Sequence, residues 1–440
     1  MNLREVIKAT HGIIISGKKN NREVGKICID SRMIEKNDIF VAIRGKKTNG
    51  NKYIDDVIEK ASLIITDKFV TSKKSTPILK VFNVKKAITS IGKYNRKKYI
   101  DKPLIGITGS VGKTTTKELI SKILETKYNI LKTIGNQNNE LGVPITLSKI
   151  NEKHDIIIME LGMSNLKEIE KLSRISKPST AVITNIGTSH IGNLKTQENI
   201  LKAKMEIAKY LKKGDLILNG SDFYLNKIKE NKNYGIIRTD SNKISNIKVD
   251  EKLHFDININ DKIYNVEFNI PNKYLIDNIL LAIEVGLIYQ IAPCAIIKAI
   301  NSFEGAEGRL EKIELPNNIT LINDCYNASP ESIKSSLSVL DNTEKKKMAI
   351  IADVLELGNH SEELHKKIGE YLEEIKDLRV ITVGDATKII NIGRHFNNNE
   401  ELKEYLNRAK LDDTTILIKG SHGMHLEEIK DYITKKYKAQ

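Results

Sequence analysis

Leu-Ile-Gly-Ile-Thr-Gly-Ser-Val-Gly-Lys-Thr-Thr, residues 104–115, joins a short apolar run to a glycine loop. Residues 104–108 are typical of a buried strand, and the residues after Lys113 have helical periodicity. In such a unit, backbone N–H groups can surround a phosphate, Lys113 can reach the β- and γ-phosphates, and Thr114 can bind Mg²⁺. The predicted phosphate-binding loop consists of Gly109, Ser110, Val111, Gly112, Lys113, Thr114 and Thr115.

The loop departs from the strict phosphate-loop pattern at one position. Ile107 stands where the pattern G-x-x-x-x-G-K-[ST] has its first glycine. A Gly-Lys-Thr triplet also occurs in ordinary strand-to-helix turns, which is the alternative interpretation of these residues. The strand before the loop and the long helix after it favour the phosphate site.

Two further strand ends supply side chains that suit a metal ion. The run over residues 155–160 ends in the carboxylate of Glu160, and a strand over 181–185 leads into a glycine-flanked loop that contains His190. Because the carboxyl ends of parallel strands meet at one edge of an open sheet, Thr114, Glu160 and His190 are expected to converge on Mg²⁺. Taken singly, Glu160 also fits a solvated strand end, and His190 a structural histidine.

A helix is expected over residues 198–210, which contain Lys202, Lys204 and Glu206. The simplest interpretation of these charges is a solvated helix face. The alternative is that one of the two lysines takes part in the chemistry of the neighbouring loops.

The first third of the chain predicts a small α/β unit followed by a parallel sheet. Apolar runs over 39–43, 63–66 and 78–82 alternate with polar turns, and a basic stretch then ends at Pro103. From Leu104 onward, strands, glycine loops and amphipathic helices alternate, which is typical of βαβ units.

The last part of the chain repeats this alternation and predicts a Rossmann-like domain. Residues 348–352, 380–383 and 415–418 are expected strands, and 361–375 is an expected helix. A chain of 440 residues exceeds the size of a single hydrophobic core. We therefore predict an α/β protein in which a central P-loop domain with a parallel sheet is flanked by two smaller domains. The predicted bounds are 1–102, 103–312 and 313–440.

Composition excludes several classes of protein. The net charge is +15, but the lysines are spread along the whole chain, so we expect no nucleic-acid partner and a positive field that attracts an anionic nucleotide. Cys28, Cys294 and Cys325 form no CxxC pair, which argues against a disulfide framework or a zinc ribbon. No apolar run approaches the roughly 18 residues that span a bilayer. A cytoplasmic protein is expected.

Five segments between residues 107 and 207 resemble one family in both order and spacing. They are ITGSVGKTTTKELI, GNQNNELGVPITL, MELGMSNLKEI, TNIGTSHIGNL and ENILKAKMEI. These segments resemble the ATPase domain of the Mur ligases and of the related folylpolyglutamate synthetases. The resemblance implies an ATP-dependent ligase with two Mg²⁺ ions, in which Lys204 is carbamylated. The implied metal ligands are Thr114, Glu160, His190 and Lys204, and the implied catalytic residues are Lys113, Lys204, His190 and Arg309.

The resemblance also implies the remaining nucleotide contacts. Residues 305–311 are similar to the G-R-x-E linker of the family, so that Arg309 is implied to approach the ATP phosphates. Asn278 matches an asparagine near the adenine, and Asp324 matches an aspartate that faces the ribose. The guanidinium group of an arginine suits phosphate oxygens.

The flanking segments resemble one branch of the family. Residues 30–32, Asp-Ser-Arg, and residues 38–45 are similar to the N-terminal Mur domain that holds the UDP end of the substrate, and residues 323–332 are similar to the segment of the member that adds D-alanyl-D-alanine. The implied substrate contacts are Ser31, Arg32, Asn138, Asn139 and Asn327. The implied reaction joins D-alanyl-D-alanine to UDP-N-acetylmuramoyl-tripeptide through an acyl phosphate, on a monomeric enzyme that takes only small-molecule substrates.

Three alternatives differ in class. A folylpolyglutamate synthetase-like ligase would lack the N-terminal Asp-Ser-Arg segment, and a GTPase would carry an [NT]KxD guanine motif, which is not found in its expected context. A basic nucleic-acid-binding protein would lose affinity steeply as the salt concentration rises.

Overall fold

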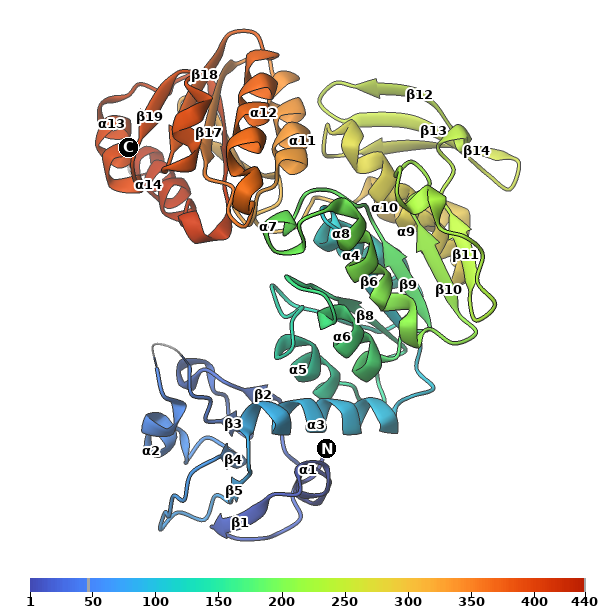
Figure 1. The fold of residues 1–440 in the computed structure, drawn as a ribbon, viewed down its shortest axis with the longest axis vertical. Helices are drawn as coiled ribbons and strands as arrows, with labels where there is room; N and C mark the ends of the chain where they lie inside the picture. Colours follow the sequence, from blue (N-terminus) through green and yellow to red (C-terminus); the bar gives the residue numbers. More distant parts are fainter. Residues whose placement is uncertain (46–47, 439–440) are drawn as a thin grey trace.

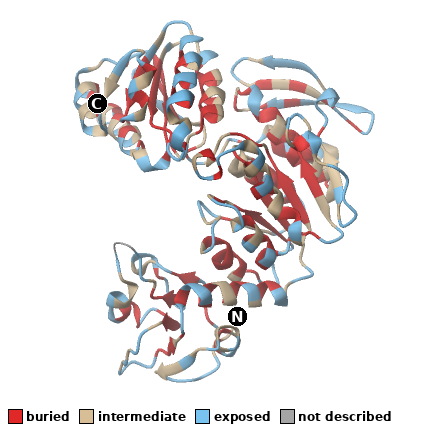
Figure 2. Ribbon diagram, in the orientation of Figure 1, coloured by how far each residue is buried: buried red, intermediate tan, exposed pale blue. Residues whose placement is uncertain are grey.

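The computed structural model describes residues 1–45 and 48–438. The chain forms three α/β units in a row, each with a sheet of its own (Figure 1). The central strands of these sheets are largely buried, whereas exposed residues gather on edge strands, helices and loops (Figure 2). The predicted α/β architecture with parallel sheets is confirmed.

The first unit is a five-stranded sheet in the order β1-β5-β4-β3-β2. Strand β1 is antiparallel to β5, and the other neighbours are parallel. The strands are β1 Ile13–Ser16, β2 Ile27–Cys28, β3 Ile39–Val41, β4 Leu63–Thr66 and β5 Ile78–Lys80, and the helices are α1 Leu3–Thr10, α2 Ile54–Val57 and α3 Val84–Lys98. Three of these strands lie on the apolar runs predicted from the sequence.

The second unit carries a six-stranded parallel sheet in the order β11-β10-β9-β6-β8-β7. Its strands are β6 Leu104–Thr108, β7 Ile130–Lys132, β8 Ile156–Glu160, β9 Thr180–Ile183, β10 Asp215–Leu218 and β11 Gly235–Arg238. Its helices are α4 Lys113–Leu124, α5 Gly142–Ser148, α6 Glu168–Ser176, α7 Ile191–Leu194, α8 Gln197–Met205, α9 Ile276–Ile288 and α10 Pro293–Asn301. Because β6 lies between β8 and β9, the ends of all three strands reach one edge of the sheet.

Two features of this unit differ from those predicted from the sequence. The helix expected over 198–210 ends at Met205 and continues as a 3-10 helix over Glu206–Tyr210. A three-stranded antiparallel sheet, which the βαβ pattern did not predict, consists of β12 Ile244–Val249, β13 Leu253–Ile259 and β14 Lys262–Phe268. Residues of β13 are buried at alternate positions, since only one face of this sheet covers the core.

The third unit is a six-stranded sheet in the order β15-β16-β20-β17-β18-β19, in which only β15 runs antiparallel. Its strands are β15 Glu311–Leu315, β16 Ile319–Asn323, β17 Lys346–Ala352, β18 Leu378–Val383, β19 Arg394–Phe396 and β20 Thr414–Lys419. Its helices are α11 Pro330–Asp341, α12 Ser361–Glu373, α13 Asn399–Arg408 and α14 Glu427–Lys438. The boundary expected after residue 312 falls inside β15, so the change of sheet occurs slightly earlier in the chain.

Helix α3 connects the first unit to the second (Figure 1). Its apolar side covers the first sheet through Ile88 and Ile91, while Gly92 lies against Pro144 of α5. A Cβ atom at Gly92 would lie 2.5 Å from the Pro144 carbonyl oxygen, so the two helices cross in close contact. Within the described residues, no helix combines the length and the apolar character that crossing a membrane requires.

Candidate active site

The predicted phosphate loop joins β6 to α4, as expected. Gly109 and Gly112 have φ angles of 152° and 82°, which disfavour other residues. A Cβ atom at Gly109 would lie 1.8 Å from Oγ1 of Thr184, and one at Gly112 would lie 2.2 Å from Nδ2 of Asn278. Both glycines are therefore required by backbone conformation and by close neighbours.

The backbone of this loop is anchored by the end of β9. The N–H groups of Ser110 and Val111 donate to the carbonyl and the side-chain oxygen of Asn185, at 3.1 and 2.9 Å. Nζ of Lys113 donates to the carbonyls of Gly109 and Ser110, at 2.8 and 3.1 Å. Burial lowers the pKa of Lys113. A phosphate that took over from these carbonyls would stabilise the ammonium group more strongly.

The carboxylate of Glu160 lies at the start of helix α4. Oγ1 of Thr114 donates to its Oε2 atom at 2.9 Å, and Nδ2 of Asn138 donates to its Oε1 atom at 2.9 Å. The Glu160 side chain is thus fixed beside the phosphate loop. A hydroxyl and a carboxylate oxygen in contact are donors that Mg²⁺ accepts.

Lys204 lies within the protein, with only 2% of its surface exposed, and lines the same cavity as Lys113 and Glu160. Burial, and secondly the charge of Lys113, hold the pKa of Lys204 well below its usual range. The solvated-face interpretation therefore fails for Lys204 and fits Lys202, which is exposed.

His190 follows β9 and immediately precedes α7. Its φ angle is 65°, an unusual backbone conformation for a histidine. Its Nδ1 atom lies 2.5 Å from Oε2 of Glu356, which belongs to the third unit. The contact with His190 lowers the pKa of Glu356.

Arg309 lies where the second unit passes into the third. Its guanidinium carbon lies over the Tyr326 ring, 4.2 Å from the ring centre, in a cation–π contact. Arg309 lines both of the large cavities between these units. It can therefore reach a group that extends from one cavity into the other.

Most of the predicted residues line one or both of two cavities. The larger, about 790 Å³, is lined by Gly109, Lys113, Asn138, Asn139, Glu160, His190, Lys204, Arg309 and Asn327. The smaller, about 330 Å³, is lined by Val111, Gly112, Thr114, Thr115, Asn278, Arg309 and Asp324. The phosphate loop separates them, so that one cavity suits a nucleotide and the other its reaction partners.

Lys419, which contacts Asp324, was not among the residues predicted from the sequence. Nζ of Lys419 lies 2.5 Å from Oδ2 of Asp324, and Oγ of Ser336 reaches the same oxygen at 2.5 Å. Lys419 is 1% exposed. Lys419 is the only charged residue of its buried strand, Thr414–Lys419, and stands at the end of that strand. This position was the feature of the sequence that could have identified Lys419 as a site residue.

Ser31 and Arg32 lie elsewhere, at the carboxyl end of β2, and line neither of these cavities. Arg32 pairs with Asp30 at 2.6 Å, and this contact lowers the pKa of Asp30 to about 2. The fold brings together the residues predicted for the nucleotide and the metal, but it keeps these two at a distance. Among residues 1–45 and 48–438, no group of three His, Cys, Asp or Glu side chains is arranged to hold a metal.

Comparisons with known proteins agree on one family. The Mur ligase middle domain matches residues 107–286, and the Mur ligase glutamate ligase domain matches residues 308–422. UDP-N-acetylmuramoyl-tripeptide--D-alanyl-D-alanine ligase from Bacillus subtilis is 32% identical over 90% of this chain and 87% of the relative. The enzyme of that name from Buchnera aphidicola subsp. Baizongia pistaciae is 32% identical over 94% of this chain and 93% of the relative.

The same family appears among solved structures. MurF from Acinetobacter baumannii superposes with a TM-score of 0.87, at 27% identity, over 98% of both chains. The similarity thus extends beyond the central unit to both flanking units.

Proposed function

This chain belongs to the Mur ligase family, and we propose that it joins D-alanyl-D-alanine to UDP-N-acetylmuramoyl-tripeptide at the expense of ATP. The observation that carries the proposal is the position of Arg309 and the phosphate loop between two adjoining cavities. One cavity receives ATP, and the other receives the carboxylate and the amine that are to be joined. The full-length similarity to ligases with this name supports the choice of substrates.

In the proposed reaction, the terminal carboxylate of the tripeptide attacks the γ-phosphorus of ATP. This step forms an acyl phosphate and releases ADP. The amine of D-alanyl-D-alanine then attacks the acyl carbon, and the tetrahedral intermediate loses phosphate to leave the amide. Lys113 and Arg309 neutralise charge on the transferring phosphoryl group, and the loop N–H groups orient it.

The proposed reaction requires Mg²⁺, and Thr114 and Glu160, which are already in contact, provide oxygen donors for it. Thr114, Glu160, His190 and carbamylated Lys204 would hold two ions, which neutralise phosphate charge when bound. The lowered pKa of Lys204 supports carbamylation, because the neutral amine is the form that attacks CO₂, forming the N–C bond and releasing a proton. Because Lys204 is buried in the cavity wall, its amine cannot act as a solvated surface charge.

Other contacts belong to the same proposal. Asn278 and Asp324 would bind the adenosine, Asn138, Asn139 and Asn327 the reacting peptide, and Ser31 and Arg32 the UDP end. The units 1–102, 103–312 and 313–440 would act as three domains of a monomer in the cytoplasm.

The test is phosphate release from ATP and Mg²⁺ with UDP-N-acetylmuramoyl-tripeptide, with and without D-alanyl-D-alanine. Release that requires both substrates, together with the pentapeptide mass, is expected. Release only with folate and L-glutamate would assign the chain to the folylpolyglutamate synthetases instead. Removing Mg²⁺ with a chelator should stop the reaction.

A further inference from the structure

Two loops from different units meet beside the proposed metal site. One is residues 187–192 of the second unit, and the other is residues 355–358 of the third. The N–H group of Gly192 donates to the carbonyl of Glu356 at 3.0 Å. A Cβ atom at Gly192 would lie 2.6 Å from that oxygen, and one at Gly358 would lie 2.8 Å from Cα of Gly192. Glycine on each side thus permits this close approach.

The side chains at this junction are also in contact. Nδ1 of His190 is shielded from solvent and lies 2.5 Å from Oε2 of Glu356, close enough for a hydrogen bond although the two groups are not aligned for one. Nearby, the N–H group of Thr188 donates to Oε1 of Glu331 at 2.8 Å. The third unit therefore places two carboxylates against the loop that carries His190.

Both residues of this contact have strained backbones. The φ angles of His190 and Glu356 are 65° and 64°, in the left-handed region. Such conformations are unfavourable for residues other than glycine and persist only where surrounding contacts fix them. The strain indicates that the junction holds these side chains in a defined geometry.

A histidine that binds a metal through one ring nitrogen usually donates the other N–H group to a carboxylate, which fixes its tautomer and orientation. We propose that Glu356 is a positioning residue: a small rotation of the imidazole ring would let Glu356 accept the Nδ1–H group of His190 and leave Nε2 as the ligand for Mg²⁺. This inference rests on the proposed function, which places a metal at His190. The new element is that Glu356, which orients the ligand His190, comes from a different domain.

Linkage follows from this arrangement. If docking of the third unit orients His190, it raises metal affinity, and metal binding must favour docking by the same factor. The affinity of the metal site would then depend, through Glu356, on whether the third unit is docked. Glu363, an exposed carboxylate in the first turn of the neighbouring helix α12, provides a matched control.

The test uses Mn²⁺ as the probe, in the presence of ADP, with binding to the full-length chain followed by electron paramagnetic resonance. Glu356→Gln should raise the Kd for Mn²⁺ by roughly 10- to 100-fold, the usual effect of losing such a carboxylate. Glu356→Asp should recover part of the affinity, and Glu363→Gln should leave the Kd unchanged. Unchanged affinity in Glu356→Gln would overturn the inference alone, whereas absence of Mn²⁺ binding by the wild-type chain would overturn the metal site itself.

A second readout separates positioning from a general structural role. The amide of Gly192 reports docking, since it donates to Glu356. Mn²⁺ with ADP should slow its hydrogen exchange in the wild type, compared with ADP alone. The metal should have little effect on exchange in a folded Glu356→Gln variant. Equal slowing in both proteins would show that metal binding favours docking without Glu356, and no slowing in the wild type would show that the two are independent; either result would overturn the linkage.

Discussion

At the scale of single residues, two buried lysines differ in their partners. Lys419 has the carboxylate of Asp324 at 2.5 Å, and the pair is enclosed between strand ends. Lys204 is buried as completely, and the largest influence of a charged neighbour on its pKa comes from another cation, Lys113. A buried ammonium group without a counter-charge destabilises a fold. Such a group is therefore expected where function requires it. We therefore expect the two lysines to respond differently to substitution.

Lys204→Met should lower the rate of ADP formation by about 100-fold or more, as expected when a group that stabilises transferring charge is lost. The free energy of unfolding should stay the same or rise, because Met fills similar space without the buried amine. Initial-rate assays and urea unfolding measure the two effects. A large loss of stability with full activity would assign Lys204 a structural role.

Lys419→Met should destabilise the protein by about 3–5 kcal/mol, because it leaves a buried carboxylate unpaired. Asp324→Asn combined with Lys419→Met should be less harmful than the sum of the single changes. Urea unfolding of the wild type, both single variants and the double variant gives the coupling energy. Additive effects would contradict a direct interaction between the two side chains.

At the scale of elements, helix α3 is more than a cover for the first sheet. Nε of Arg96 donates to the carbonyl of Ser176 at 2.7 Å, and its Nη1 atom donates to Tyr99 and Lys102, at 2.7 and 2.9 Å. Asn95 donates to three carbonyls around the end of α5. These polar side chains are buried because they satisfy carbonyl groups at the ends of neighbouring helices.

Arg96→Met should lower the free energy of unfolding by about 3 kcal/mol, since several carbonyls lose a charged donor inside the protein. Lys97→Gln, at an exposed position on the same helix, should change it by less than about 0.5 kcal/mol. Urea denaturation monitored by circular dichroism compares the two. Equal effects would mean that α3 is held by its apolar side alone.

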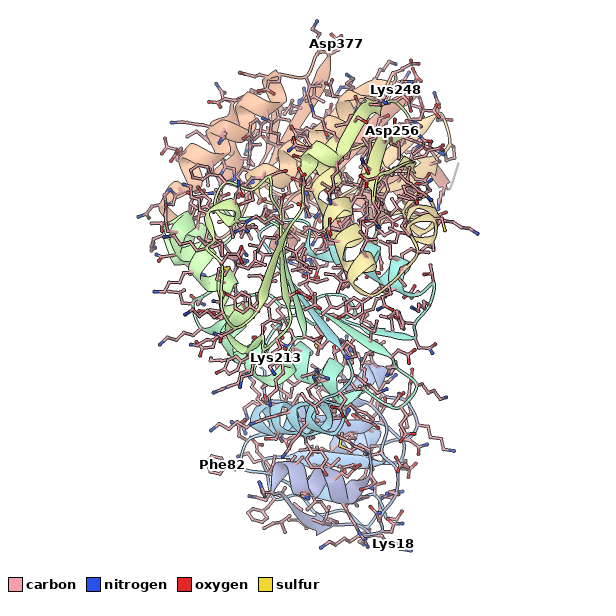
Figure 3. The ribbon with its side chains drawn as sticks, turned by 90° about the vertical axis from the view of Figure 1, so that its right-hand side faces the viewer. Lys18, Phe82, Lys213, Lys248, Asp256 and Asp377 are labelled. Carbon is pink, nitrogen blue, oxygen red and sulfur yellow. The ribbon has the colours of Figure 1, made fainter. Side chains whose placement is uncertain are left out.

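At the scale of the whole molecule, the active-site cavities lie between units rather than within one of them. The larger cavity is lined by residues from both the second and the third unit, such as Lys113 and Ser421. Lysines are spread over the long axis, as Lys18, Lys213 and Lys248 illustrate in Figure 3. This distribution supports general attraction of an anionic nucleotide more than a single nucleic-acid surface.

Binding of both substrates should compact the molecule. A nonhydrolysable ATP analogue and UDP-N-acetylmuramoyl-tripeptide would contact both units at once and favour a closed arrangement that excludes water from the acyl phosphate. Small-angle X-ray scattering should show a smaller radius of gyration with both ligands than with either alone. An unchanged radius would argue against closure as part of the reaction.

The local parts of this protein could be predicted from the sequence. Apolar runs determined the central strands because buried parallel strands need continuous hydrophobic residues. Gly109, Gly112 and Lys113 determined the loop because its backbone conformation and its phosphate chemistry depend on neighbouring residues. Helix ends were less predictable: α8 becomes a 3-10 helix at Glu206, whose carboxylate accepts from the N–H groups of Lys167 and Glu170, a tertiary contact that helical periodicity does not show.

Only the tertiary structure decided which charges are buried and which residues meet. Glu356 reaches His190, and Lys419 reaches Asp324, across large separations in the chain. Periodicity describes one element at a time, whereas these contacts depend on how one sheet is placed against another. The burial of Lys204 likewise depends on that packing, because the same helix carries the exposed Lys202 two residues earlier. The sequence by itself thus determined the strands and the phosphate loop, and the packing of the units determined the electrostatic environment in which they act.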